Sequence, residues 1–444
     1  MTAAPYVAKG INFDSLVVED AAQGLFRVHR RSLADADIFA LEKRRIFDRC
    51  WIYAGHDSEV PAPGDFRTRS VAGRPVILCR DDGGLVRVLL NSCRHRGAQV
   101  CTEAKGNARA FQCYYHGWTY NNRGALIGVP DPSSYSPAFD RAKLALRSPP
   151  RTDSYRGFIF VSFDPKVTSL RDYLAGAAEY LDIIADHCEA GMEVLPGSHS
   201  YCIRSNWKLL MENAVDDFHV MTTHHRFLQY LQDSNQLDPE SPRGLVGVAR
   251  DLGNGHAVVE RKAPWARPIA KWSPIFGDER RAEFEHRQSE FEQRLGKERG
   301  YRLTQLNRNL IIFPNLMVND IMGVIIRSCY PTRPDFMEVD AWCLAPRGER
   351  RDDRKTRLEN FISFLGPAGF ANPDDAEALE SVQRALGTSG EVEWSDMSRG
   401  MAKSEPAATD ELQLRAFWRQ WRRLMSLPSG DELALSGLPA HAAV

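Results

Sequence analysis

The amino-acid sequence predicts an α+β protein in which a small all-β unit interrupts a larger unit of helices and antiparallel strands. Short β-rich runs separated by turn-forming residues fill positions 51–163, while helical periodicity precedes and follows them. Later strand-like runs, "MGVIIRSCYP" and "MEVDAWCLAP" among them, suit an antiparallel sheet with helices packed on it.

These patterns divide the chain into four segments. Apolar residues at helical spacing in 34–50 predict a helix, and we assign 1–50 to the N-terminal helical part of the larger unit. Residues 51–163 form the all-β unit, and 164–428 form the rest of the larger unit. The last residues, 429–444, lack a sustained pattern and are predicted to be a mobile tail.

Two further stretches are predicted to be helical. Residues 206–231, "NWKLLMENAVDDFHVMTTHHRFLQYL", read as one long amphipathic helix. Residues 279–298 are rich in charge and read as a helix with one packing edge and a solvated face.

Composition narrows the class of protein. The formal net charge of -1 over 444 residues gives no reason to expect a polyanion or an anionic membrane as partner. No apolar run approaches the roughly 18 residues that span a bilayer, and the first residues lack a secretion signal. The nine scattered cysteines fit a reducing compartment better than a disulfide framework, so we expect a cytoplasmic protein.

A first metal site is predicted by two short motifs inside the all-β unit. Cys93 and His95 are two residues apart, and Cys113 and His116 are three apart. A structural zinc site usually takes paired cysteines from one knuckle and paired histidines from a helix. Here each loop supplies one of each, which suits both thiolates on one iron and both imidazoles on the other, the ligand set of a Rieske [2Fe–2S] centre. Glycines at 97 and 117 would let both loops bend tightly.

A second metal site is predicted within 206–231. Asp216 and His219 are three residues apart, so a helix would project them from one face, whereas His224 needs the helix to distort or end before it. Two histidines with one distant carboxylate form the facial triad of non-haem Fe(II) oxygenases. Asp374 and Asp375, which follow a Gly/Pro-rich turn, are the candidate carboxylates.

With both motifs in view, the chain resembles the catalytic α subunit of Rieske non-haem iron aromatic-ring-hydroxylating oxygenases over nearly its whole length. The resemblance rests on "CRHRG", "CYYHGW", "NWKLLMENAVDDFH", "IIFPN", "LGPAGF" with its Asp-Asp pair, and "RAFWRQWRRLM". It implies a Rieske domain inserted in a helix-grip (START-like) catalytic domain whose antiparallel sheet covers the iron helix. It also implies a homotrimer, in some members joined by three small β subunits.

The resemblance carries functional residues over one by one. It places the mononuclear iron on His219, His224 and Asp375, with His225 and Asp374 as alternatives. Asp216 matches the carboxylate that bridges the partner subunit's His116 to the ligand His219. Its neighbour Asp217 is expected to be merely solvated.

The resemblance also implies the reaction. One [2Fe–2S] cluster and one Fe(II) per subunit would let the enzyme use O2 and electrons from an NADH-dependent reductase, with or without a ferredoxin, to cis-dihydroxylate an aromatic ring in aromatic catabolism. The alternative in the same superfamily is a monooxygenase that hydroxylates a ring or demethylates oxidatively. A Rieske electron carrier and a zinc-stabilised binding protein are alternatives from other classes.

The substrate pocket is less defined by sequence. Leu365 and Ala371 match family positions that line the cavity, although ordinary loop packing explains them as well. Arg327 and Arg415 could pair with a substrate carboxylate because arginine offers a bidentate fork, or they could be structural arginines of a strand and a helix. An aromatic carboxylate is therefore one hypothesis for the substrate.

Overall fold

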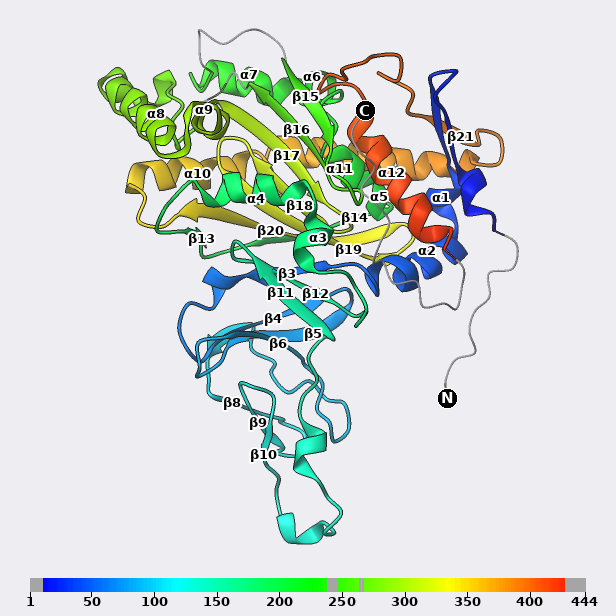
Figure 1. Cartoon of the computed structure of the whole chain (residues 1–444), viewed down its shortest axis with the longest axis vertical. Coiled ribbons are helices and arrows are strands. Elements are labelled where there is room, and N and C mark those ends of the chain that lie inside the picture. The colour runs from blue at the N-terminus through cyan, green and yellow to red at the C-terminus, as the bar shows by residue number, and fades with distance from the viewer. Residues whose placement is uncertain (1–10, 238–245, 263–264, 266, 428–444) are drawn as a thin grey trace. The chain divides into compact units, whose positions relative to one another are not determined.

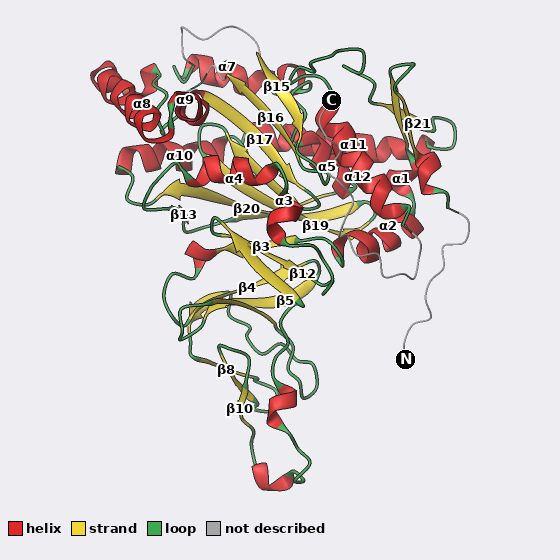
Figure 2. Ribbon diagram, in the orientation of Figure 1, coloured by secondary structure: helices red, strands yellow, loops and turns green. Residues whose placement is uncertain are grey.

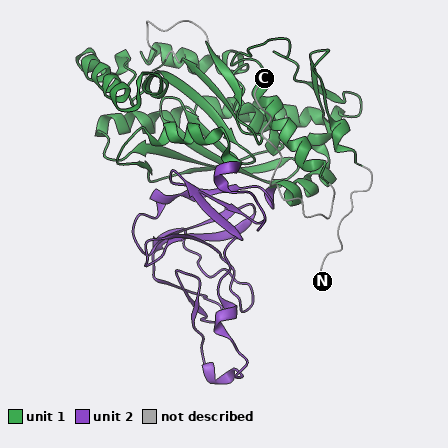
Figure 3. Cartoon of the chain, viewed as in Figure 1, with its two compact units in different colours: residues 1–46, 173–433, 438–444 green, residues 47–172, 434–437 purple. Residues whose placement is uncertain are grey.

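The computed structural model describes residues 11–237, 246–262, 265 and 267–427 (Figure 1). They divide into two compact units, one made of residues 47–172 and the other of the residues before and after that stretch (Figure 3). The predicted mobile tail lies outside the described residues. Within the described part, no helix is both long and apolar enough to cross a bilayer.

The smaller unit is all-β, as its sequence predicts, and its strands form three antiparallel sheets. The strands are β3 (Ile52–His56), β4 (Asp65–Val71), β5 (Arg74–Arg80), β6 (Val86–Leu90), β7 (Lys105–Asn107), β8 (Ala110–Gln112), β9 (Thr119–Asn121), β10 (Leu126–Gly128), β11 (Arg151–Tyr155) and β12 (Phe158–Ser162). Cys93 and Cys113 belong to the same buried core as Phe66 and Tyr120. The two cysteine–histidine loops are therefore rooted in the core of this unit.

The larger unit is built on an antiparallel sheet, as predicted, and this sheet has eight strands (Figure 2). Its order is β13-β20-β19-β18-β17-β16-β15, with β14 also paired to β20. The strands are β13 (Met192–Val194), β14 (His199–Ile203), β15 (Val246–Asp251), β16 (Ala257–Lys262), β17 (Leu306–Ile312), β18 (Leu316–Asp320), β19 (Val324–Arg333) and β20 (Phe336–Pro346). A small sheet joins β1 (Val17–Asp20), β2 (Leu25–His29) and β21 (Trp394–Asp396).

Helices cover this sheet and the ends of its strands (Figure 2). The predicted charged helix is α8, and the predicted N-terminal helix is α2 followed by a π-helical turn at Lys43–Phe47. The helices are α1 (Arg31–Ala34), α2 (Ala36–Glu42), α3 (Leu170–Leu174), α4 (Ala177–Ala185), α5 (Trp207–Asn213), α6 (Val220–Thr223), α7 (His225–Asp233), α8 (Arg281–Leu295), α9 (Lys297–Gln305), α10 (Arg351–Ser363), α11 (Ala371–Ala385) and α12 (Leu412–Met425).

Strand register sorts side chains between the two faces of the large sheet, because successive residues of a strand point to opposite faces. Ile325 and Ala341 lie on the face that packs against Phe361 of α10 and Ala371 of α11. On the other face, Arg308 donates to the carbonyl of Arg302 in α9, and α9 contacts α4. The site described below forms on the first face.

The prediction of one long helix over 206–231 is wrong. The segment forms α5, α6 and α7, with irregular backbone between Asn213 and Val220. The side chain of Asp216 accepts the N–H of Phe218 at 2.8 Å, the kind of local bond with which aspartate competes against a helix. Asp216 and His219 therefore meet through a loop and not on a helix face.

Candidate metal centres

The two cysteine–histidine loops of the smaller unit have the same backbone geometry. The carbonyl of each cysteine, Cys93 or Cys113, accepts the N–H of the glycine four residues on at 2.9 Å. The N–H of each cysteine donates to the carbonyl five residues on, at 2.7 and 2.8 Å. Both glycines have positive φ, 82° at Gly97 and 69° at Gly117, which a residue with a Cβ adopts only at a cost. This repetition makes the loops a matched pair.

The side chains of these loops separate by type. Cys93 and Cys113 are buried free thiols, whereas His95 is exposed and His116 half-buried. The two imidazole rings lie next to one another, with centroids 4.5 Å apart, and Trp118 stacks on His95 at 4.9 Å. Thiols in the core and imidazoles towards the surface match the two ends of a [2Fe–2S] cluster.

The spacing of these four ligands argues against a single zinc ion. Donor atoms of a tetrahedral zinc site lie roughly 4 Å apart, as bond lengths of about 2.0–2.3 Å require. Among the described residues, no three of these four side chains bring their donor atoms within 4.8 Å of one another. The set therefore fits a cluster with two metal ions better than a structural zinc site.

A second group of ligands forms in the larger unit. The Nε2 atoms of His219 and His224 are 3.1 Å apart, and the Oδ1 atom of Asp375 is 3.4 Å from the first and 3.2 Å from the second. Three donors on one face of an octahedral ion at about 2.1 Å lie roughly 3 Å apart. The group thus fits one ion bound by two histidines and a carboxylate.

Three separate pieces of local structure position this group. His219 ends the loop after α5, His224 lies between α6 and α7, and Asp375 lies in α11. The alternatives are placed differently. His225 is exposed, and the Oδ2 atom of Asp374 is 3.5 Å from Nδ1 of His224, the ring nitrogen that faces away from the other ligands.

Hydrogen bonds orient the ligands. Asp216 Oδ2 lies 3.1 Å from Nδ1 of His219, so a proton on Nδ1 leaves the Nε2 lone pair facing the other two ligands. Asn213 donates its side-chain N–H to Oδ1 of Asp375 at 3.0 Å. The position of Asn213 in the sequence does not reveal this role, because only the fold brings its amide to a residue far along the chain.

The electrostatics of the group favour a cation. Burial would lower the pKa of His219, but hydrogen bonds to Asp216 and Asp375 outweigh burial and raise this pKa to about 10. Burial would raise the pKa of Asp375, but the two imidazoles hold it well below its usual range. A positive charge is thus stabilised among these side chains, and a metal ion supplies one.

Asp217 is not solvated, and its predicted role is wrong. Its side chain is fully buried, and its Oδ1 accepts a hydrogen bond from Nη1 of Arg261, on β16, at 2.6 Å. The pair ties the loop that carries Asp216 to the sheet.

A cavity opens beside the three ligands, with about 540 Å³ of unfilled space when its mouth is included. Its walls combine apolar side chains with a few polar ones, the usual composition of a small-molecule site. Of the residues suggested from sequence, Leu365 and Arg327 line it. Ala371 lies in the core behind it, and Arg415 is outside it, where it donates to the carbonyls of residues 397 and 399.

Comparisons with known proteins agree with this geometry. Residues 50–150 match the model of the Rieske [2Fe–2S] domain, and residues 171–427 match the model of the ring-hydroxylating α-subunit catalytic domain. Toluate 1,2-dioxygenase subunit α of Pseudomonas putida is 34% identical over 87% of this chain and 84% of its own. The large subunit of 2-halobenzoate 1,2-dioxygenase of Burkholderia cepacia is 32% identical over 86% and 82%. The crystal structure of naphthalene 1,2-dioxygenase from Rhodococcus sp. bound to indole superposes with a TM-score of 0.79 at 30% identity, over 91% of this chain and 95% of that one.

Proposed function

The chain belongs to the family of ring-hydroxylating oxygenase α subunits, and from that premise we propose that it cis-dihydroxylates the ring of an aromatic carboxylate in aromatic catabolism. The substrate class follows the similar relatives, whose names are those of toluate, halobenzoate and anthranilate 1,2-dioxygenases. The single observation that carries the proposal is the convergence of His219, His224 and Asp375 beside a cavity, in a chain that also carries the paired cysteine–histidine loops.

The two matched domains account for two cofactors, a Rieske [2Fe–2S] cluster and a mononuclear iron. Cys93, Cys113, His95 and His116 would hold the cluster. His219, His224 and Asp375 would hold the iron, which when bound would supply the redox chemistry that makes dioxygen reactive towards carbon. The zinc-binding alternative does not account for either match.

The chain's own residues prepare the site in three ways. Asp216 fixes the tautomer of His219, and Asn213 orients the carboxylate of Asp375. Asp217 and Arg261 hold the loop between α5 and α6 against the sheet. Apolar side chains of the cavity wall exclude water and hold a ring close to the ligands.

The proposed reaction needs electrons from outside the chain, and their route determines which partner proteins and which arrangement of subunits the proposal requires. Electrons come from an NADH-dependent reductase, with or without a ferredoxin, in the cytoplasm. The subunits form a homotrimer, joined or not by three small β subunits, so that the partner subunit's His116 approaches Asp216. A carboxylate between two imidazoles gives a short hydrogen-bonded path for the electron. Asp216 suits this role because its side chain is partly exposed, at 23%, while it contacts His219.

Counting labelled oxygen atoms tests the reaction. Purified protein with reductase, NADH and 18O2 is offered benzoate, toluates, anthranilate, 2-chlorobenzoate and neutral arenes, and the products are analysed by mass spectrometry. Cis-dihydroxylation predicts a diol that carries both labelled atoms on adjacent carbons. A product with one labelled atom, or a demethylated product, would make the chain a monooxygenase.

A further inference from the structure

The buried arginines of the larger unit differ in how their charges are matched. In the described part of this unit, the buried arginines are Arg261, Arg267, Arg308, Arg327, Arg357 and Arg415. All but one contact a carboxylate or two backbone carbonyls. These partners are Asp217 for Arg261, Asp320 for Arg267, Glu260 and Asp320 for Arg308, Glu349 for Arg357, and the carbonyls of residues 397 and 399 for Arg415.

Arg327 is the exception. Its side chain is 2% exposed, and its Nε donates to Oδ1 of Asn319 at 3.2 Å. Nη1 is buried without a hydrogen-bond partner, and no carboxylate of the described residues lies within 4.0 Å of the guanidinium. Burying a cation without a counter-charge is costly, so this position is unexplained by the stability of the chain alone.

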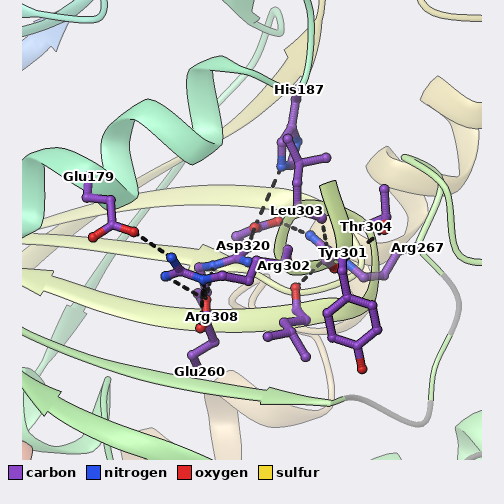
Figure 4. A network of polar contacts seen from close by, with 11 residues as sticks. Glu179, His187, Glu260, Arg267, Tyr301, Arg302, Leu303, Thr304, Arg308 and Asp320 are labelled. Carbon is purple, nitrogen blue, oxygen red and sulfur yellow. Dashed lines mark hydrogen bonds and ion pairs between the residues drawn. The ribbon is translucent and has the colours of Figure 1, made fainter. Parts of the chain in front are cut away.

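The opposite face of the same sheet shows what a compensated arrangement looks like. Glu260, Arg308 and Asp320 are directly opposed on three neighbouring strands and alternate in charge. Asp320 also contacts Arg267, and Glu260 also contacts Arg302 (Figure 4). Every guanidinium in this network meets a carboxylate. Among the described buried arginines of this unit, the one without a carboxylate or carbonyl partner lies on the face that carries the cavity.

Register places polar side chains around Arg327 on the cavity face. Asn309 opposes Asn319 across β17 and β18, and Asn319 opposes Ile325, which lies two residues before Arg327 on β19. Asn319 donates its side-chain N–H to Oδ1 of Asn309 at 2.9 Å while it accepts from Arg327. Both asparagines and Arg327 line the cavity. These two asparagines, the Asn319–Asn309 ladder, fix the guanidinium by its Nε edge and leave its terminal nitrogens for another acceptor.

A second unsatisfied donor lies close by. The hydroxyl of Tyr201, on β14, is buried close to Arg327 and donates to no acceptor among the described residues. Burial raises the pKa of Tyr201, and the nearby guanidinium of Arg327 opposes that rise. Tyr201 and Arg327 oppose Val339 and Ala341 on β20, which share a face. Two buried donors without acceptors thus occur together on the side of the sheet that faces the iron ligands.

We propose that Arg327, held by the Asn319–Asn309 ladder, is the anchor that binds the carboxylate of an aromatic acid and selects such acids over neutral arenes. This inference rests on the proposed function and adds the residue that decides its substrate class. The guanidinium binds the carboxylate through its terminal nitrogens, while apolar wall residues such as Phe227, Trp265 and Leu365 hold the ring beside the iron ligands.

Binding to the iron- and cluster-loaded protein under argon tests the anchor without turnover. Calorimetry is run with benzoate, 3-toluate, anthranilate and 2-chlorobenzoate, and with the matching amide of each acid. The wild-type protein should bind at least one acid at least about 10-fold more tightly than its amide. Arg327→Gln should weaken that acid by about 30-fold or more and leave its amide within about 3-fold. Arg327→Lys should fall between, because lysine keeps the charge without the planar fork.

Thermal unfolding separates a binding role from a structural one. Arg415→Gln is the control, since Arg415 is equally buried but outside the cavity and bonded to the backbone. It should lower the Tm of the ligand-free protein and keep the Tm increase that the acid produces. Arg327→Gln should leave the ligand-free Tm unchanged or higher, because it removes an unmatched buried charge, and should lose the acid-induced increase.

Three results would overturn the anchor. They are equal binding of acids and amides by the wild-type protein, unchanged acid affinity in Arg327→Gln, and a drop in ligand-free Tm in Arg327→Gln as large as that in Arg415→Gln. If Arg327→Gln does not fold, the anchor is still tested by comparing the affinities of the wild-type protein for acid and amide, and by the acid affinity of Arg327→Lys. The anchor and the reaction fail separately. If the protein adds two labelled oxygen atoms to a neutral arene and binds acids no more tightly than amides, only the anchor is refuted. If it binds an acid through Arg327 but adds only one labelled atom to it, only the proposed reaction is refuted.

Discussion

The two candidate metal centres differ in how the chain assembles them. The proposed cluster ligands all lie in residues 93–116, on two loops of matching backbone whose imidazoles approach the surface. The proposed iron ligands come from positions 219, 224 and 375, and two of the three side chains are buried beside a cavity. A centre that exchanges electrons with other proteins needs an accessible edge, whereas a centre that binds a ring and O2 needs enclosure. The difference in burial therefore follows the difference in task.

The largest effect is expected from removing a cluster ligand. His116→Ala should abolish the visible absorption of the cluster and reduce the iron content from three atoms per chain to one, with product formation at background. His286→Ala, an exposed histidine of α8, is the control and should keep both. An unchanged spectrum in His116→Ala would remove His116 from the ligand set.

Removing a ligand of the mononuclear iron should affect that iron site and leave the cluster intact. Asp375→Ala is expected to lose the mononuclear iron and all product formation while the cluster spectrum stays intact, since the two sites share no ligand. Asp374→Ala and His225→Ala are matched controls that should keep three iron atoms per chain. Loss of iron in either control, with retention in Asp375→Ala, would contradict the assigned ligand set.

Asp216→Asn should slow electron transfer between the two centres without removing the metal from either. Asparagine keeps an acceptor for Nδ1 of His219 but removes the charge, so both metals should remain bound. We expect product formation to fall by roughly 10–100-fold, measured together with iron content and the cluster spectrum. Wild-type rates in this variant would exclude the bridging role.

The smallest effect concerns a neutral carboxyl near the iron site. Burial raises the pKa of Glu212, on α5, to about 8, and the hydrogen bond from Trp418 opposes that rise. The folded state then holds a proton that the unfolded chain releases near its ordinary pKa of 4.5. This contribution to stability is fully present below about pH 4.5 and is lost as the pH rises to about 8, by at most about 1.4 kcal/mol per pH unit.

Glu212→Gln should remove that part of the pH dependence because the amide cannot ionise. Between pH 6 and 8, the Tm of the wild-type protein should therefore fall more steeply than that of the variant, at roughly 2–4 °C per kcal/mol. Parallel curves for the two proteins would show that Glu212 ionises at its ordinary pKa.

The contrast between a centre built from one local segment and a centre built from distant segments also explains what could be predicted from sequence. Cys93, His95, Cys113 and His116 form a local motif, so their spacing alone predicts the cluster. The two histidines of the iron site are also local, whereas the distant Asp374–Asp375 pair offers two candidate carboxylates, and only the resemblance selects Asp375. Geometric features that arise between distant segments escaped prediction.

Three such features are the broken helix, the burial of Asp217 and the unmatched charge of Arg327. At the break, the side chain of Asp216 takes a backbone N–H that a helix would use, and Asp217 pairs with Arg261, and periodicity indicates neither bond. The isolation of Arg327 depends on the register of β17, β18 and β19, which no single stretch of sequence encodes. The all-β unit and the antiparallel strands are local patterns, and both were predicted correctly.

A single turnover without reductase tests the central claim that one centre stores the electron that the other uses. The cluster is reduced chemically under argon, the reductant is removed, and an aromatic acid and O2 are added together. The account predicts that the cluster absorption returns to its oxidised form at the rate at which the dihydrodiol appears, in proportion to it, and that Asp216→Asn slows both. Product that forms while the cluster stays reduced, or cluster oxidation that is as fast in Asp216→Asn as in the wild-type protein, would contradict it.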